Sequence, residues 1–388
     1  MKYWRGYIAA AIFAALTIAL MTFAEAHSAL VDMIYPYTTR LIQTSLATWT
    51  AGADFCLWQL LVVVLGVVAL ASIVIMIILR WNFFQWMGWV LAICSFVFMM
   101  HTGIYGLNTY SGSISEDIRL EEADFTVTEL AKATEYYLSI ANELSSQVPR
   151  KGDGTVDFPS FQEMAAMAGD GFKVLTYEEY YAVFAGSTLP VKELGWADMY
   201  TSMGITGVTM PLTGEAAVNP QTPAVALPFV MCHEMCHRMC ISLERDANMG
   251  AFLACDAHPD PVFRYSGYFM AFRYCYNALV SVGTSTSSTA ANQISAMIND
   301  QVRADLKYYQ SFFQQKQNAT ATQIANTAND TYIKVSGDSS GIASYSKVSD
   351  LLVSWYIQTI EVPMHQEEEI PFDPTDKNQV DLTVPNGG

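Results

Sequence analysis

Basic residues are scarce in this chain. Its 388 residues contain 20 lysines and arginines against 37 aspartates and glutamates, which gives a net charge of -17. Such a chain repels phosphate backbones and anionic headgroups, so neither nucleic acid nor an anionic membrane surface is expected as a partner. The sequence also lacks an internal repeat, a phosphate-binding loop and a nucleophile elbow, which excludes solenoids, P-loop nucleotidases and α/β-hydrolases.

Cysteines are few, and their spacing excludes a disulfide framework. Two of the seven lie in hydrophobic segments, and the other five are an odd number without CxxC spacing. We interpret them as small buried apolar side chains. A bridge between Cys240 and Cys255 remains open as an alternative.

Charge is also missing from three long apolar runs, at about residues 7–23, 57–79 and 83–100, which predict membrane-spanning helices. The first could instead be a signal peptide, because Ala24-Glu25-Ala26 resembles a cleavage site, but its core exceeds the usual apolar length. Residues 25–55 are expected to form a loop. Residues 1–101 would then be a membrane anchor embedded in the lipid bilayer, and the uncharged spans disfavour a transporter or channel.

The few basic residues near these runs predict the orientation. Lys2, Arg5 and Arg80 belong in the cytoplasm by the positive-inside rule, which places everything after His101 outside. The sequence therefore predicts a multi-pass protein of the cell membrane with an extracytoplasmic C-terminal domain.

That domain, residues 102–360, is expected to be α+β and mostly helical. A capping box at residues 126–129 opens one helix, and helical spacing predicts others at 161–168, 176–184, 265–276, 294–313 and 348–360. Residues 204–210 have the alternation of a strand. The Ser/Thr-rich stretch 281–289 is predicted to be a loop, and the acidic tail 361–388 to be disordered.

The most informative stretch is His233-Glu234-Met235-Cys236-His237. On a helix the two histidines lie four residues apart and leave the same face, so they can hold one Zn²⁺ between them. Glu234 can reach a water at the metal without binding the metal itself, which is the position of a general base in metallopeptidases.

Glu244 is the candidate third ligand. Along one unbroken helix it would lie about 16.5 Å from His233, so the helix must end between His237 and Glu244. Ser242 is a candidate N-cap for the next helix. Asn248, one turn after Glu244, could hydrogen-bond one of the metal-binding side chains without binding the metal itself.

These residues resemble the metal site of gluzincins, the zinc peptidases with a glutamate ligand. Most of the chain resembles an uncharacterised bacterial family of membrane-anchored HExxH proteins, a domain of unknown function that is assigned to peptidases by motif alone. The matching stretches are Gly106-Leu107-Asn108, Thr134-Glu135-Tyr136, Ala141-Asn142-Glu143-Leu144, Gly204-Ile205-Thr206-Gly207, Pro211-Leu212-Thr213-Gly214-Glu215-Ala216, Leu227-Pro228-Phe229, Phe263-Arg264-Tyr265-Ser266-Gly267-Tyr268 and Asn329-Asp330-Thr331-Tyr332.

The resemblance implies a zincin-like fold in which residues 204–210 form the strand that pairs with extended substrate. Two positions depart from the family pattern: Cys240 stands where the family tends to have glycine at the helix break, and Cys236 replaces a small residue. A left-handed backbone at Cys240 would be less comfortable without glycine.

Further candidates are weaker. Arg264, Tyr265 and Tyr268 could stabilise the oxyanion of a peptidase, although such side chains pack structurally as often. Glu215 and Asn219 could face the cleft or bond their own turn. His258, between aspartates and prolines, is expected to be a surface histidine rather than a ligand.

The leading function is zinc-dependent hydrolysis of peptide or protein substrates, with His233, His237 and Glu244 as ligands and Glu234 as base. The alternative is a membrane-anchored extracytoplasmic binding or sensor protein with a structural or inactive zinc site. The alternative would not need Glu234, whose presence favours the enzyme.

Overall fold

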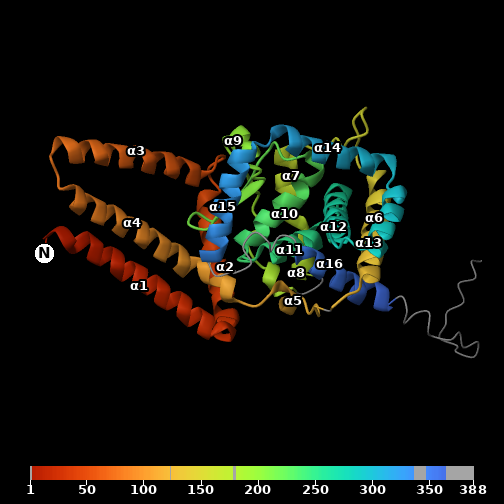
Figure 1. The fold of residues 1–388 in the computed structure, drawn as a ribbon, viewed down its shortest axis with the longest axis horizontal. Helices are drawn as coiled ribbons and strands as arrows, with labels where there is room; N and C mark the ends of the chain where they lie inside the picture. Colours follow the sequence, from red (N-terminus) through yellow and green to blue (C-terminus); the bar gives the residue numbers. More distant parts are fainter. Residues whose placement is uncertain (1, 123, 178–180, 336–346, 364–388) are drawn as a thin grey trace, which may run out of the picture.

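The computed structural model describes residues 2–122, 124–177, 181–335 and 347–363. It is mostly helical, with a small three-stranded sheet and three long apolar helices near the N-terminus, as the sequence predicts (Figure 1). These three helices are α1 (Arg5–Ala26), α3 (Leu57–Ile78) and α4 (Phe83–Ile104), and each is long and apolar enough to cross a membrane. They project together from the globular part of the chain.

Two of the long helices pack tightly and the third stands apart. A Cβ atom on Gly6 of α1 would lie 2.4 Å from the backbone of Gly88 in α4, so the two backbones cross at a pair of glycines. None of the residues in the apolar window of α3 is buried. It meets α4 near their common turn, where the Trp86 indole donates to the Ser72 hydroxyl at 3.3 Å, and the two helices then diverge toward the globular part (Figure 1).

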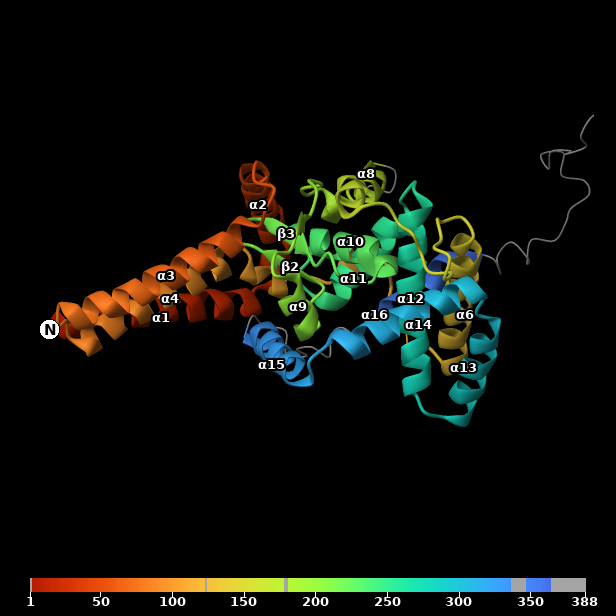
Figure 2. The ribbon, with the colours of Figure 1, turned by 90° about the horizontal axis from the view of Figure 1, so that it is seen from above.

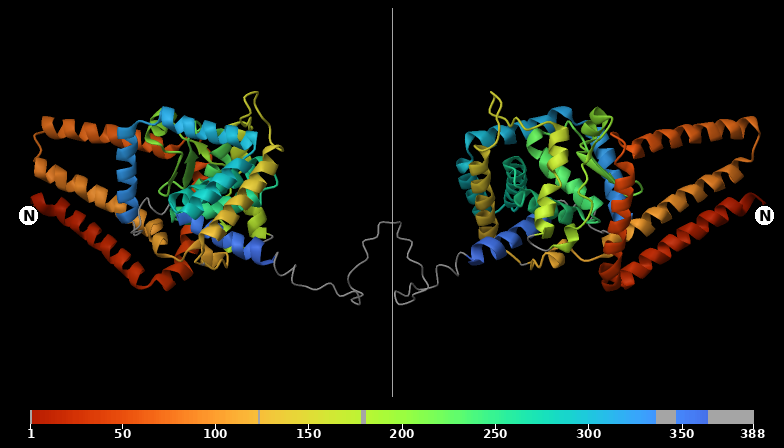
Figure 3. Two further views of the ribbon diagram at one scale, coloured as in Figure 1. Left: turned by 45° about the vertical axis from the view of Figure 1, so that its right-hand side comes forward. Right: turned by 180° about the vertical axis from the view of Figure 1, so that it is seen from behind.

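Residues 25–55 were expected to form a loop, and that prediction is wrong. They contain helix α2 (Ser28–Thr50), which lies along the globular part on the side that the three long helices approach (Figure 3). Its buried Arg40 and Gln43 donate to backbone carbonyls of Met239 and Pro211, respectively. The segment between the first two apolar helices is thus part of the globular structure.

The globular part is built from helices around α10, α11 and α12 (Figure 2). Its helices are α5 (Ile114–Asp117), α6 (Val127–Ser145), α7 (Phe161–Met167), α8 (Asp170–Tyr177), α9 (Ala197–Met203), α10 (Leu227–Arg238), α11 (Glu244–Asp256), α12 (Pro261–Ser281), α13 (Ser285–Met297), α14 (Asp300–Lys316), α15 (Ala319–Val335) and α16 (Val348–Tyr356). The predicted capping box of Thr126 and Glu129 opens α6.

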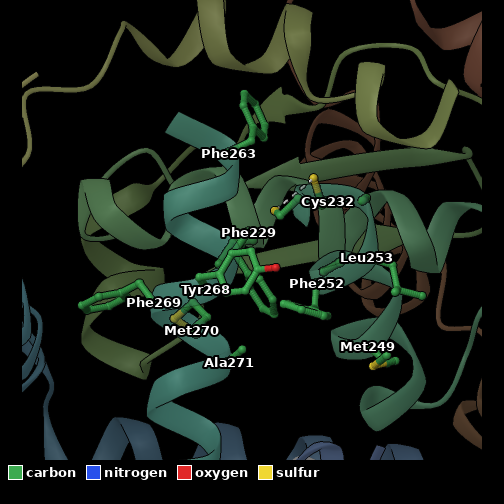
Figure 4. Packing of buried hydrophobic residues seen from close by; sticks show 14 of the residues in the cluster. Phe229, Cys232, Met249, Phe252, Leu253, Phe263, Tyr268, Phe269, Met270 and Ala271 are labelled. Atoms are coloured by element: carbon green, nitrogen blue, oxygen red, sulfur yellow. Dashed lines mark hydrogen bonds between the residues drawn. The ribbon is translucent and has the colours of Figure 1, made fainter. Parts of the chain in front are cut away.

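The hydrophobic core fills the space between α10, α11, α12 and α6 (Figure 4). The ring of Phe252 in α11 packs edge-on against Tyr268 of α12, with centroids 5.5 Å apart. Burial of such aromatic side chains supplies most of the stability of this packing. All seven cysteines are free, so Cys240 and Cys255 form no bridge.

The sheet has the strand order β1-β3-β2, with β1 (Lys192–Glu193) parallel and β2 (Gly207–Met210) antiparallel to β3 (Glu215–Val218). The predicted strand at 204–210 is confirmed, although it begins at Gly207. Within the described part of the chain β2 forms an edge of this sheet, and it lies beside α10.

Other predicted boundaries were wrong. Residues 281–289 are not a loop, because α13 begins at Ser285 behind a capping box of Thr284 and Ser287. Of the helix expected at 176–184, the first two residues end α8 and Ala182–Phe184 form a 3-10 turn, while residues 178–180 lie outside the described residues. The helix expected at 294–313 is divided between α13 and α14, whereas the final short helix is confirmed by α16. Most of the acidic tail lies outside the described residues.

Candidate metal centre

Helix α10 positions the two histidines. Pro228 occupies its first turn, where the missing N–H costs nothing. Because His233 and His237 are one turn apart, their imidazoles leave the same side of the helix, and their Nε2 atoms lie 3.1 Å apart.

The predicted helix break is present and brings Glu244 back to the histidines. Helix α10 ends at Arg238, and Cys240 has φ 71°, the left-handed conformation. The Cys240 amide donates to the His237 carbonyl at 2.9 Å and the Ile241 amide to the Cys236 carbonyl at 3.1 Å, which together form a Schellman motif. Helix α11 then starts at Glu244. Ser242 is not its N-cap, because Leu243 holds that position and the Ser242 hydroxyl has no partner.

Three donor atoms meet in a triangle whose edges suit one metal ion. The His233 and His237 Nε2 atoms lie 3.3 Å and 3.4 Å from Glu244 Oε2, and the third edge is the 3.1 Å between the nitrogens. Ligands at about 2.0–2.1 Å from a tetrahedral ion stand roughly 3.3 Å apart. The triad could therefore hold a metal ion, and the described residues contain no other cluster of this kind.

The three side chains of the triad are partly exposed to solvent. The side chains of His233, His237 and Glu244 keep 12%, 13% and 14% of their surface exposed. His233, His237 and Glu244 would hold the ion, and three protein ligands are the number typical of catalytic zinc sites.

A hydrogen bond behind His237 sets its ring orientation. Its Nδ1 lies 2.9 Å from the Ile241 carbonyl, the residue that closes the Schellman motif. A carbonyl only accepts, so Nδ1 carries the proton, and in the neutral imidazole Nε2 presents its lone pair to the triad. The turn that ends α10 thus also orients the imidazole of His237, a candidate metal ligand.

The Glu244 carboxylate and the two histidines each favour the charged form of the other. Burial alone would lower the pKa of His237, but the neighbouring Glu244 carboxylate raises it to about 9. Burial would raise the pKa of Glu244, and the two histidines outweigh it and hold that pKa well below its usual range. Without a metal, Glu244 is a buried carboxylate that depends on positive charge beside it.

Glu234 lies next to the triad and is held from strand β2. Its carboxylate Oε2 accepts a hydrogen bond of 2.8 Å from the Thr209 hydroxyl. A Cβ atom on Gly207 would lie 2.3 Å from Glu234 Oε1, so only glycine lets the carboxylate pack against this strand. Only 5% of Glu234 is exposed, and desolvation raises its pKa despite the histidines and Thr209.

The cysteines near the triad remain thiols. Cys236 points toward α11, where a Cβ atom on Gly250 would lie 2.7 Å from its Sγ, and burial raises its pKa well above the usual value. Burial likewise raises the pKa of Cys240 to about 11. Thiols of this kind are poor metal ligands, which agrees with a triad of histidines and glutamate alone.

Asn248 lies beside the site, with one contact that the sequence did not indicate. Its Oδ1 accepts a hydrogen bond of 3.2 Å from the Tyr274 hydroxyl of α12, and its buried Nδ2 has no partner among the described residues. Burial raises the pKa of Tyr274, and the charge of Glu244 adds to this rise. Tyr274 is one of 21 tyrosines, and nothing in the sequence singles it out.

The structure does not bring the other oxyanion candidates to the triad. The Tyr265 hydroxyl is buried and donates to Asp305 at 2.6 Å. The Tyr268 hydroxyl donates to Asp256, whose pKa also responds to Arg264. Asp256 ends the helix that Glu244 begins, so twelve residues, about 18 Å, separate this group from the metal ligands.

Three other side chains have structural roles. Glu215 and Asn219 do not face the triad: Glu215 accepts the amides of Leu57 and Trp58, and Asn219 donates to Thr201 and the Ile205 carbonyl. His258 is buried rather than exposed. It stacks on Phe263 and bonds the Met167 carbonyl.

The fold and the triad define a mostly helical protein with three candidate membrane helices and a His-His-Glu cluster that could hold a metal ion. The chain belongs to the family described as Protein of unknown function (DUF3810), whose family model matches residues 31–353. No curated protein and no solved structure matches it. The expected family of unknown function is thereby confirmed, while no link to metallopeptidases comes from these comparisons.

Proposed function

We propose that this protein is a membrane-anchored zinc metallopeptidase. The observation that carries the proposal is the triangle of His233, His237 and Glu244, with the Glu234 carboxylate held beside it. A structural zinc site is closed by a fourth protein ligand, whereas three ligands with partial exposure are typical of a catalytic site.

A zinc ion held by the triad would supply Lewis acidity, polarising a peptide carbonyl and acidifying water. Glu234 takes a proton from the attacking water as the new C–O bond forms. It then gives that proton to the amine nitrogen as the C–N bond breaks, so that one water is consumed per peptide bond. The raised pKa of Glu234 suits a group that must first accept and then donate.

We assign substrate positioning to β2 and oxyanion stabilisation to Tyr274. The edge strand β2 lies beside α10, so an extended peptide could pair with it and cross the triad. The Tyr274 hydroxyl is the proposed donor, because it lies 3.2 Å from Asn248 Oδ1, one turn after Glu244 on α11. Arg264 and Tyr265 are not retained in this role.

The three long helices are proposed to span the bilayer. The domain ends of α1, α3 and α4 all lie beside the globular part, that of α3 apart from the other two, and the N-terminus and the turn between α3 and α4 lie at the other end (Figure 1). By the positive-inside rule the basic end is cytoplasmic, which places the globular part, including α2 and residues 102–360, outside the cytoplasm. Protease added to intact cells should then digest the globular part and spare the N-terminus.

The experiment uses the full chain in detergent, because α2 is part of the globular structure. Zinc content is measured by mass spectrometry, followed by cleavage of a mixed peptide library. We expect about one zinc per chain in the wild type and in Glu234→Gln, and none in Glu244→Ala. Cleavage should be lost in both variants and kept in the exposed control Glu135→Gln.

The second candidate, a binding or sensor protein with a structural or inactive zinc site, predicts a different result. Zinc would bind and depend on Glu244, but no peptide would be cleaved in a way that depends on Glu234. A chain that binds no zinc would contradict both candidates.

A further inference from the structure

We infer that the substrates are membrane-anchored polypeptides, cut in the segment that leaves the bilayer on the side of the globular part. This inference rests on the proposed peptidase function and names its substrate class. It follows from how closely the triad, the edge strand and a groove between α14 and α15 lie to the ends of the long helices.

The metal helix is held by the residue that follows α4. Tyr105 comes directly after Ile104, the last residue of α4, and its buried hydroxyl donates to the backbone carbonyl of His237 at 3.1 Å. Arg40 of α2 donates to the Met239 carbonyl at 3.1 Å. A single side chain therefore separates the end of a candidate membrane helix from the backbone of a metal ligand.

The sheet is held by the start of α3. The buried carboxylate of Glu215 in β3 accepts the amides of Leu57 and Trp58 at 2.8 Å and 2.9 Å, and it pairs with Lys192 at 2.7 Å. These amides belong to the first turn of α3, where an anion is favourable. Strand β2 is the direct neighbour of β3. The strand that we propose to pair with the substrate therefore lies close to the end of α3 from which the chain would leave the bilayer.

A groove of about 640 Å³ lies between α14 and α15. Its lining includes the amides of Gln314, Gln317, Gln323 and Asn326, together with the ring of Phe313 and the carboxylate of Asp330. Gln317 packs against Gly204, three residues before β2. Uncharged amides pair with the backbone of an extended peptide and offer little to a phosphate headgroup.

Helix α15 connects this groove to the membrane end of the structure. At its start the Asn318 amide donates to the Ser202 carbonyl of α9 at 2.9 Å. Near its end the Tyr332 hydroxyl lies 3.1 Å from His101 Nε2 in the last turn of α4. The helix therefore runs from α9 to α4 along the side that the long helices approach (Figure 3).

Helices α3 and α4 diverge toward the globular part (Figure 1). Ser72 contacts α4 near the common turn, and the apolar face of α3 beyond it is exposed. A transmembrane helix of the substrate would lie between α3 and α4. Its emerging strand would then meet the groove, β2 and the triad within a few residues of the bilayer.

The test reconstitutes the full chain in liposomes with a reporter that has one transmembrane helix and a randomised linker of about 30 residues. The same linker without the helix is a second, soluble probe. Cleavage positions are read by mass spectrometry. We expect cuts within about ten residues of the span, roughly 33 Å at ~3.3 Å per extended residue, at least tenfold faster than in the soluble probe.

Paired variants test the space between the helices. Leu65→Trp with Val68→Trp places bulk on the face of α3 that Ser72 shares, and Val63→Trp with Leu70→Trp places it on the opposite face. All four positions are exposed apolar sites. The first pair should slow cleavage of the anchored reporter at least fivefold without affecting the soluble probe, and the second pair should leave both rates unchanged.

The outcomes separate the inference from the function on which it rests. Cleavage that depends on Glu234 but is spread evenly along the linker, or is equally fast on the soluble probe, would keep the peptidase and overturn the membrane-anchored substrate. Slowing by both tryptophan pairs alike would also overturn it. No cleavage of either probe would contradict the peptidase itself.

Discussion

At the scale of single residues, the environment of Glu234 decides whether the site can act as a base. Burial raises the pKa of this carboxyl, while the two histidines and the Thr209 hydroxyl act against that rise. Each of these groups favours the charged form that accepts a proton. The Thr209 contact is the one that can be changed without touching a proposed metal ligand.

We therefore expect Thr209→Val to weaken catalysis while leaving zinc bound. Removing a hydrogen bond to the carboxylate raises the pKa of Glu234 further, so more of it is protonated at a given pH. The acidic limb of the profile of kcat/KM against pH should move to higher pH. Activity at neutral pH should fall roughly tenfold, equivalent to about 1.4 kcal/mol.

Thr209→Ser is the matched control, because it keeps the hydroxyl and should retain the wild-type profile. An acidic limb at the same pH in Thr209→Val and the wild type would show that Thr209 does not act on Glu234. Loss of zinc in Thr209→Val would instead assign it a structural role.

The sequence predicts the triad because its spacing is local, and it does not predict the contacts that tune it. HExxH and the later glutamate lie within twelve residues, and the helical period brings them together once the break is recognised. Thr209, Gly207 and Tyr274 reach the site from β2 and α12. Those contacts depend on tertiary packing, which no pattern in the intervening residues encodes.

At the scale of elements, the turn between α10 and α11 sets the geometry of the triad. Cys240 adopts a left-handed backbone conformation there. The backbone carbonyl of the next residue, Ile241, accepts a hydrogen bond from Nδ1 of His237 and so orients that imidazole. A side chain other than glycine in this conformation costs about 1–2 kcal/mol. The strain lies two residues beyond Arg238, the last residue of α10.

This strain predicts an order of stability for two variants that both remove the thiol. Cys240→Gly should be more stable than Cys240→Ala by about 1 kcal/mol, because glycine adopts the left-handed conformation freely. Chemical unfolding of the full chain in detergent measures the difference. In a right-handed helical position alanine would be the more stable of the two, so the opposite order would contradict the left-handed turn.

The elements that sequence patterns predicted are those with a strong local signal. The three apolar helices, the capping box of α6 and the strand before the metal helix belong to this group. Helix α2 was missed because Pro36 lies inside it and its buried Arg40 and Gln43 are polar. The start of α13 was missed because its serines and threonines are typical of loops. In the structure Thr284 instead forms a capping box with Ser287.

At the scale of the whole molecule, the clamp of Glu215 on α3 joins the sheet to a candidate membrane helix. The Glu215 side chain is fully buried, and Lys192 is only 13% exposed. Removing one member of such a pair leaves the other charge buried without a partner, at a cost of about 3–5 kcal/mol. The two amides of α3 would also lose their acceptor.

Glu215→Ala should therefore loosen α3 from the sheet as well as destabilise the globular part. Hydrogen exchange in detergent, read at the amides of Leu57 and Trp58, should become faster in this variant, whereas Asp170→Asn in the exposed pair with Lys173 should leave it unchanged.

The double variant Glu215→Leu with Lys192→Met removes both charges and should recover much of the stability, because an apolar pair costs far less than a lone buried charge. It should not restore protection of the two amides, since leucine offers no acceptor. Recovery of stability without recovery of protection would separate the two roles of Glu215, and unchanged exchange in Glu215→Ala would show that the sheet is not held to α3 by this carboxylate.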